Sequence, residues 1–245
     1  SRRQRQMCIR DRKNTVTETF NIDVPIFAFS HCRDVVAAVS KAGGFGVLGA
    51  VGHSPDALEI DLKWIEDEVG ERPYGVDLIV PAKYEGSDEG GLTVHKIADM
   101  IPDAHHEYVT EILEKYDVPE LAETKSGQFS MKNDGAAPMS AGTAGPQLEI
   151  ALAHNPSLVV NALGPPPQFM IDQVKEAGRK VGALAGKAQH AERHVNAGVD
   201  LIIAQGYEAG GHTGEIGSMV LIPEIVDAVG DVPVLGAGGI GRGRQ

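Results

Sequence analysis

Short apolar runs alternate with amphipathic helical patterns along most of the chain. The runs are almost continuously apolar, which is typical of parallel strands whose two faces are both covered. Segments of helical length separate them, so the strands are expected to pair in parallel through βαβ crossovers. The expected strands are residues 24–29, 44–50, 74–80, 158–163, 180–185, 199–204 and 232–236. The expected helices between them are residues 33–42, 54–69, 167–177, 188–197 and 218–229.

Two of these strands run into glycine-rich segments. Residues 204–215 read Ala-Gln-Gly-Tyr-Glu-Ala-Gly-Gly-His-Thr-Gly-Glu, and residues 232–240 read Val-Pro-Val-Leu-Gly-Ala-Gly-Gly-Ile. Ligands of α/β folds bind at the carboxyl ends of the strands, where glycines let backbone N–H groups approach a phosphate. Gly-Gly is also a common tight turn, and a lone histidine such as His212 is more often structural than catalytic. Two such segments, one βα unit apart, favour a phosphate site over that simpler interpretation.

The stretch from residue 82 to about residue 145 interrupts the alternation of expected strands and helices. It contains an expected helix over residues 104–116 and then a run rich in Gly, Ser, Ala, Asn and Pro over residues 123–145. A helix near residues 147–154 returns the chain to the fourth strand. Such an excursion is either a mobile lid or a surface ornament. We prefer the lid, because the excursion leaves from the edge of the sheet where ligands bind.

The element order predicts a TIM (β/α)8-type barrel that is C-terminally truncated, with about seven parallel strands. A complete barrel needs about 250 residues, and the excursion uses much of the length of this chain. An open doubly wound sheet is the competing architecture, but no Gly-x-Gly-x-x-Gly follows the first strand. We therefore interpret residues 14–245 as one incomplete domain.

The composition is that of an ordinary globular protein, with 42% of the 245 residues hydrophobic and a formal net charge of −12. This charge argues against nucleic acid or an anionic membrane surface as a partner. No apolar run approaches the ~18 residues of a membrane-spanning helix. The two cysteines give no disulfide framework, as expected in a reducing compartment such as the cytoplasm.

The first thirteen residues differ from the rest because they hold six of the 22 basic residues and a single acid. A basic arm for nucleic acid and a targeting peptide are two interpretations, although no apolar core follows that a secretory signal would need. We prefer a third, that residues 1–13 are a non-native or disordered extension without a function.

Four segments together resemble the nitronate monooxygenase family, formerly called 2-nitropropane dioxygenases. They are residues 37–49 (Ala-Ala-Val-Ser-Lys-Ala-Gly-Gly-Phe-Gly-Val-Leu-Gly), 74–77 (Tyr-Gly-Val-Asp), 204–214 and 237–240 (Ala-Gly-Gly-Ile). The likeness runs from about Val24 to Ile240 outside much of the excursion, and only the Gln-Gly-x-Glu-Ala-Gly-Gly-His-x-Gly segment is specific by itself. The resemblance implies a TIM barrel that binds FMN non-covalently and oxidises nitronates with dioxygen.

The resemblance also assigns expected roles to individual residues. His212 matches the active-site histidine of the family, acting either as a base on a neutral nitroalkane or, as we prefer, as a partner of an anionic nitronate. Gln205 is expected to contact the flavin, and the backbone at Ala28 and Phe29 to pass along its ring. Lys187, which follows the fifth strand, is expected to reach a phosphate or the flavin edge. Backbone donors to the FMN phosphate are expected at Gly210, Gly211, Gly238 and Gly239.

Two departures from the family pattern matter. Asp77 stands where the family usually has Asn, and a carboxylate beside a flavin would discourage an anionic reduced ring. Asp77 therefore either bonds to a different donor or changes the tuning of the flavin. Nothing after Ile240 supplies the Gln-x-Gly-Thr segment that completes phosphate binding in the family. The chain is therefore expected to be a fragment, and weak FMN binding or incomplete folding would follow.

Other histidines and one cysteine form weaker candidates. His190 and His194 share a helix face with Glu192 between them, but zinc proteases need His-Glu-x-x-His, and a solvated helix surface is the favoured interpretation. His105 and His106 are expected to be solvated. Cys32 follows His31, but a Cys–His nucleophile is disfavoured because no third partner is evident.

Three alternatives to nitronate oxidation remain open at this point. They are a flavin- and NAD(P)H-dependent enoyl-acyl-carrier-protein reductase, an inactive truncated flavin-binding fragment, and a phosphate-binding barrel without flavin. The expected partners are a small nitronate and dioxygen, with no nucleic acid and no membrane. A homodimer is one option for the assembly.

Overall fold

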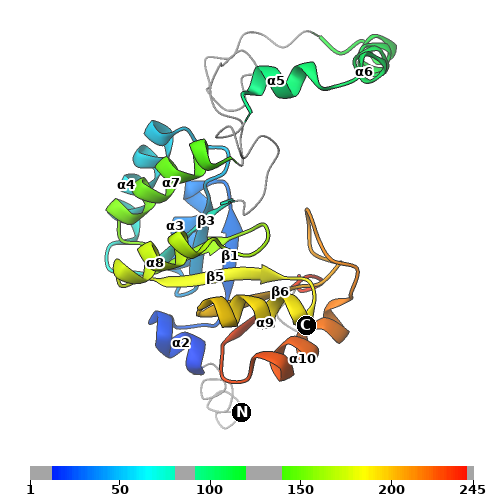
Figure 1. The fold of residues 1–245 in the computed structure, drawn as a ribbon. Coiled ribbons are helices and arrows are strands. Elements are labelled where there is room, and N and C mark those ends of the chain that lie inside the picture. Colours follow the sequence, from blue (N-terminus) through cyan, green and yellow to red (C-terminus); the bar gives the residue numbers. More distant parts are fainter. Residues whose placement is uncertain (1–12, 81–91, 120–139, 242–245) are drawn as a thin grey trace, which may run out of the picture.

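Seven parallel strands form one sheet whose order along the sheet is the order along the chain, β1 to β7 (Figure 1). The structure is a computed structural model that describes residues 13–80, 92–119 and 140–241. Each strand pairs in parallel with the next. This sequential order is that of a TIM barrel and excludes a doubly wound sheet, in which the order reverses. The strands are β1 (Phe27–Ser30), β2 (Phe45–Gly49), β3 (Tyr74–Leu78), β4 (Leu158–Asn161), β5 (Lys180–Ala185), β6 (Leu201–Gln205) and β7 (Val234–Ala237).

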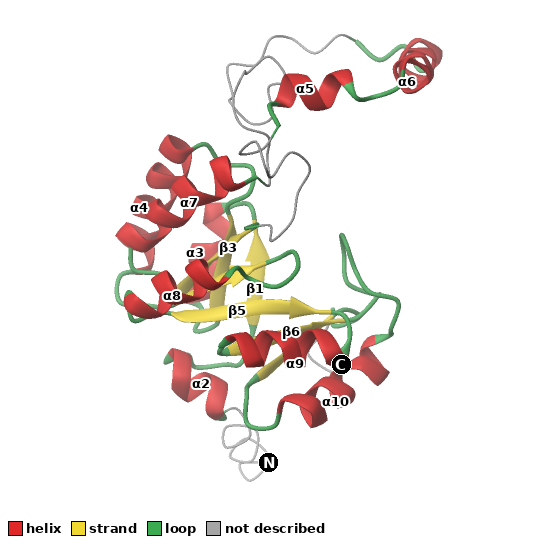
Figure 2. Cartoon of the chain, viewed as in Figure 1, coloured by secondary structure: helices red, strands yellow, loops and turns green. Residues whose placement is uncertain are grey.

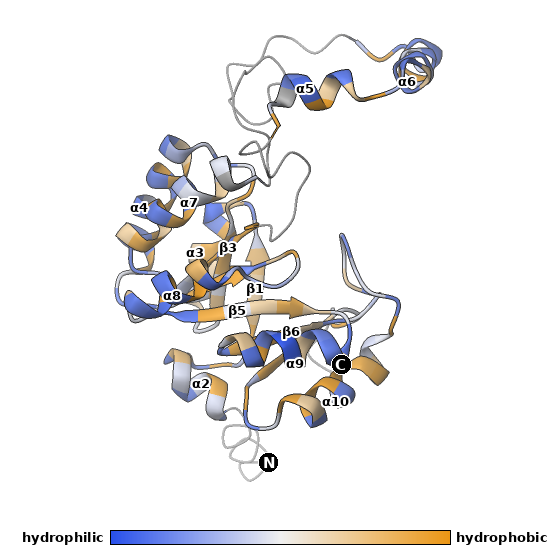
Figure 3. Cartoon of the chain, viewed as in Figure 1, coloured by the Kyte–Doolittle hydropathy of each residue, from blue (hydrophilic) through white to orange (hydrophobic). Residues whose placement is uncertain are grey.

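Two apolar cores lie on the two faces of the curled sheet. Successive side chains of a strand point to opposite faces, and on β3 the side chains of Tyr74, Val76 and Leu78 join the larger core under the covering helices. Phe45 and Val47 of β2 join the second, inner core. In Figure 3 the strands are mostly tan to orange, and the helices that cover them carry both blue and orange residues. The alternation of side chains along each strand decides which of them face the inside of the barrel.

The helices that cover the sheet follow the predicted pattern (Figure 2). The predictions for α9 and α10 are confirmed to the residue. The helix before β4 is longer than expected, because a capping box between Ser140 and Thr143 starts it before Pro146. The covering helices are α3 (Arg33–Lys41), α4 (Pro55–Val69), α7 (Ala141–Ala153), α8 (Gln168–Glu176), α9 (Ala188–Ala197) and α10 (Ser218–Val229).

A short helix that the sequence pattern did not predict, α2 (Thr15–Phe20), lies below the start of β1 (Figure 1). A capping box between Asn14 and Thr17 starts it. Its Phe20 side chain is 4% exposed and packs edge-on against the rings of Phe27 and Phe45. The helix therefore packs into the inner core at the amino-terminal end of the barrel. Residues 1–12, the bulk of the predicted extension, lie outside the described residues.

The described part of the excursion contains α5 (Val94–Asp99) and α6 (Asp103–Lys115), which stand apart from the sheet in Figure 1. α6 confirms the helix expected at residues 104–116, and none of its residues is buried. Neither of these two described helices lies against the strands in Figure 1, and the lid stays a prediction. None of the described helices has both the length and the apolar character needed to cross a bilayer.

His154 fastens α7 to α4 near the amino-terminal ends of the strands. Its Nδ1 lies 2.9 Å from Glu66 Oε2, and its Nε2 lies 3.0 Å from Glu59 Oε2. Burial alone would lower the pKa of His154, but the two carboxylates outweigh it and raise the pKa above 6.5. Both ring nitrogens therefore donate hydrogen bonds as an imidazolium.

We expect the substitution His154→Gln to remove a pH-dependent part of the stability. The raised folded-state pKa means that this part is fully present below pH 6.5 and is lost as pH rises through the folded pKa. At pH 6 the variant should lose about 1.5–3 kcal/mol, the range for hydrogen bonds to charged groups. Urea unfolding between pH 6 and pH 9 measures this loss. A constant difference between the two proteins across that range would contradict the proposed charge pairing.

Candidate active site

The loop from β6 to α10 is folded by its own polar side chains. Gln205 Nε2 donates to the Gly210 carbonyl at 3.3 Å. The Glu208 carboxylate accepts from Ser218 N at 2.9 Å and from Ser218 Oγ at 3.1 Å, which caps the start of α10. The backbone N–H of Ser218 lowers the pKa of Glu208, so the cap is charged. Gln205 and Glu208, two residues of the Gln-Gly-x-Glu-Ala-Gly-Gly-His-x-Gly segment, thus shape this loop.

Glycines make the same region open to a ligand. Gly211 has φ 78°, Gly238 has φ 111° and Gly239 has φ 72°, a region that other residues rarely adopt. A Cβ at residue 238 would lie 2.9 Å from Ala209 N, so a side chain there would displace the loop. A Cβ at Gly210 or Gly211 would meet nothing within 4 Å. Neither of these two N–H groups donates a backbone hydrogen bond within the described residues.

His212 lines a cavity of about 320 Å³ next to these glycines. One wall comes from the loop itself, through Thr213 and Gly214. The strands contribute Leu184 and Gln205, and the loop after β4 contributes residues 162–165. The opposite wall comes from α9 through His190, Arg193 and His194. Imidazoles and one guanidinium, with no carboxylate among the lining residues, favour a small anion.

The interpretation of His190 and His194 as a solvated helix surface is wrong for His194, which is only 3% exposed. His190 is half-buried, and both side chains line this cavity. The Nε2–H of His194 donates to the Leu184 carbonyl at 3.1 Å, and Nδ1 is buried without a partner. Burial lowers the pKa of both imidazoles, so both are neutral at pH 7. Their i, i+4 spacing was the available signal, but the sequence could not show which way that helix face points.

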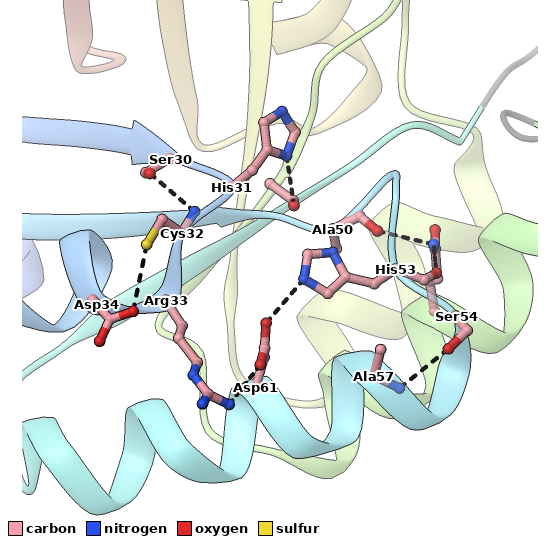
Figure 4. Close-up of polar contacts among 12 residues, drawn as sticks. Ser30, His31, Cys32, Arg33, Asp34, Ala50, His53, Ser54, Ala57 and Asp61 are labelled. Atoms are coloured by element: carbon pink, nitrogen blue, oxygen red, sulfur yellow. Dashed lines mark hydrogen bonds and ion pairs between the residues drawn. The ribbon is translucent and has the colours of Figure 1, made fainter. Parts of the chain in front are cut away.

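The opposite rim of the barrel is formed by the end of β1 and by β2 (Figure 4). The His31 ring donates from Nδ1 to the Gly49 carbonyl at 2.9 Å and lies edge-on to Phe29, with ring centres 5.1 Å apart. A Cβ at residue 49 would lie 2.6 Å from Phe29 and 2.7 Å from His31. Glycine at position 49 therefore lets the two rings lie against the strand. Ala28 precedes Phe29 in β1 and is half-buried.

The loop from β2 to α4 is fixed from two sides (Figure 4). His53 Nε2 lies 3.0 Å from Asp61 Oδ2, and Asp61 Oδ1 accepts from Arg33 at 2.8 Å. Gln147 of α7 donates from Nε2 to the carbonyls of Ala50, at 3.0 Å, and His53, at 2.9 Å. These contacts fix the conformation of the loop from β2 to α4.

Asp77 lies on β3, beside Gly49 of β2 in the register of the sheet. Its side chain is 9% exposed, and its Oδ1 is buried without a hydrogen-bond partner. Burial raises the pKa of Asp77 to about 8, so the carboxyl group is neutral at pH 7. An unpaired donor of this kind inside the barrel is compatible with a ligand that presents an acceptor.

Lys187 and Cys32 have few contacts with the rest of the candidate site. Lys187 is the exposed N-cap of α9, at the carboxyl end of β5, and does not line the His212 cavity. Cys32 is exposed, and its thiol lies 3.4 Å from Asp34 Oδ2. The structure does not pair it with His31, whose Nδ1 is bound to Gly49. The part of the chain that is described contains no cluster of three metal-ligating side chains.

Two known proteins are similar to this chain in sequence. A Mycobacterium tuberculosis protein named as a monooxygenase is 50% identical over 233 residues, which are 95% of this chain and 61% of that protein. A Staphylococcus saprophyticus protein named "Probable nitronate monooxygenase" is 31% identical, over 94% of this chain and 61% of its own length. The chain thus spans about three-fifths of these relatives.

Solved structures give the same fold. A nitroalkane oxidase from Streptomyces ansochromogenes superimposes with a TM-score of 0.67 at 25% identity, covering 94% of this chain and 62% of that chain. FabK from Thermotoga maritima gives a TM-score of 0.65 at 24% identity over 95% of this chain and 56% of its own. The sequence profile of the nitronate monooxygenases matches residues 13–245. The chain belongs to the nitronate monooxygenase family.

Proposed function

We propose that the chain binds FMN non-covalently at the carboxyl ends of its strands and belongs to an enzyme that oxidises alkyl nitronates with dioxygen. One observation carries the proposal: the open glycine loop, with unused N–H donors, adjoins the cavity that His212 lines. Backbone amides bind phosphate without a counter-charge. They suit a chain whose net charge of −12 would otherwise repel an anion.

The residues present fit a flavin. Gly210, Gly211, Gly238 and Gly239 would hold the phosphate, and Lys187 would approach it from the end of β5. Gln205 and the backbone at Ala28 and Phe29 would flank the ring. Asp77 supplies a buried polar atom that no described protein group satisfies. The bound flavin would supply the redox chemistry, taking electrons from the substrate and passing them to dioxygen.

In this proposal His212 binds the nitronate. A nitronate arrives already deprotonated, so its oxidation needs a partner for the negative charge rather than a base. His212, His190 and Arg193 line the same cavity and can present N–H donors to a small anion. His194 does not, because its N–H is used by the Leu184 carbonyl. The cavity of about 320 Å³ is large enough for a small substrate beside a cofactor ring.

The test begins with the absorption spectrum of the purified chain after incubation with FMN. Under anaerobic conditions, an alkyl nitronate should bleach the bound flavin, and NADPH should not. Bleaching by NADPH alone would replace the proposal with a flavin reductase. A protein that retains no flavin would contradict the cofactor assignment.

A further inference from the structure

The side chain of Asp77 points into the barrel. Its β3 neighbours Tyr74, Val76 and Leu78 belong to the core on the outer face of the sheet. A Cβ at Gly75 would lie 2.8 Å from the ring of Phe45, which belongs to the inner core. Because strand side chains alternate, residue 77 shares the inner face with residue 75.

The surroundings of Asp77 offer no compensation for a charge. Its partners in the sheet register are Gly49 on β2, which has no side chain, and Val160 on β4, which is buried in the inner core. The ionisable side chain that the structure places over Gly49 is His31, whose Nδ1–H is used by the Gly49 carbonyl. No described charged group contributes to the pKa shift of Asp77, which burial alone explains.

A carboxyl group in this setting is stable only in its neutral form, since an unpaired buried charge is costly. A neutral carboxyl group is a hydrogen-bond donor. Its Oδ1 has no partner in the described residues, so this atom is available to a group on a bound ligand. The glycine loop and the rings of Phe29 and His31 line the same end of the barrel.

We propose that Asp77 donates a hydrogen bond from a neutral carboxyl group to an acceptor atom of the flavin ring, so that cofactor binding is coupled to retention of this proton. The inference rests on the proposed function. It adds that a carboxyl group at residue 77 donates a hydrogen bond, as an amide would, while it is protonated. The carboxyl group loses this ability when it ionises.

The test is FMN affinity as a function of pH, measured by flavin fluorescence with the wild-type chain and the Asp77→Asn variant. Binding should weaken about 10-fold from pH 7 to pH 9 in the wild type, because the carboxyl group of Asp77 ionises near pH 8. Asparagine donates at every pH, so the FMN affinity of the variant should not show this 10-fold loss. Ionisation of the FMN phosphate affects both proteins equally and cancels in the ratio. Asp34→Asn, which neutralises an exposed carboxylate on α3, is the matched control and should follow the wild type.

A second measurement uses the protein without cofactor. The raised pKa makes Asp77 progressively unfavourable to folding as pH rises from about 4 to 8. Asp77→Asn should therefore unfold at a higher urea concentration than the wild type at pH 8, and at a similar one at pH 4. Equal pH profiles for FMN binding by wild type and Asp77→Asn would overturn the proton coupling while leaving flavin binding intact. Absence of FMN binding by both proteins at every pH would overturn the proposed function and this inference with it.

Discussion

Replacing His212 by Asn should lower turnover of an alkyl nitronate about 100-fold, the usual effect of removing one donor that stabilises transition-state charge. His212 lines the cavity from the glycine-rich loop after β6 and has no described hydrogen-bond partner whose loss would disturb the fold. FMN content should be unchanged, because the phosphate is assigned to backbone groups. Steady-state kinetics with the flavin-loaded protein measure the effect.

A suitable control for this variant is His106→Asn, the same substitution at an exposed position on α6. It should leave turnover unchanged. If His212→Asn turns over nitronate at the wild-type rate, His212 has no part in the reaction. If the variant instead loses its flavin, the histidine supports the cofactor rather than the substrate.

Truncating Phe20 to Ala should destabilise the protein by about 3–5 kcal/mol, the range for large-to-small changes at a buried aromatic residue. Its ring lies 5.4 Å from that of Phe27 and 5.1 Å from that of Phe45, both edge-on. The cavity left behind would open at the base of the inner core. Urea unfolding monitored by circular dichroism gives the free energy.

Thr19→Ala, an exposed change on the same helix, separates packing from helix formation. It should alter the unfolding free energy by less than about 0.5 kcal/mol, as surface changes usually do. A loss below about 1 kcal/mol in Phe20→Ala would mean that α2 does not pack into the barrel as the structure shows.

The barrel was predictable because its periodicity is local. The apolar run at residues 180–185 and the amphipathic runs at 188–197 and 218–229 match β5, α9 and α10 to the residue. α2 was missed for a physical reason. Its Thr-Val-Thr segment has poor intrinsic helix propensity, and burial against the inner core makes the helix stable in spite of it.

The candidate site was predictable only in part. The glycines around His212 gave its position, because glycine-rich strand ends have a direct backbone meaning. The contribution of α9 depends on which face of the helix meets the loop. The position of the His31 ring depends on Gly49, which lies 18 residues away along the chain. Asp77 was visible as an unusual residue, but its lack of a partner is a property of three strands together.

The double hydrogen bond from Gln147 couples two distant stretches of sequence mechanically. One amide group satisfies the carbonyls of Ala50 and His53, and both contacts are buried. Moving α7 away would leave the His53 carbonyl without its donor, at a cost of about 1–3 kcal/mol, and would leave the Ala50 carbonyl with the His53 N–H alone. The loop after β2 and the helix that precedes β4 are therefore expected to move together rather than independently.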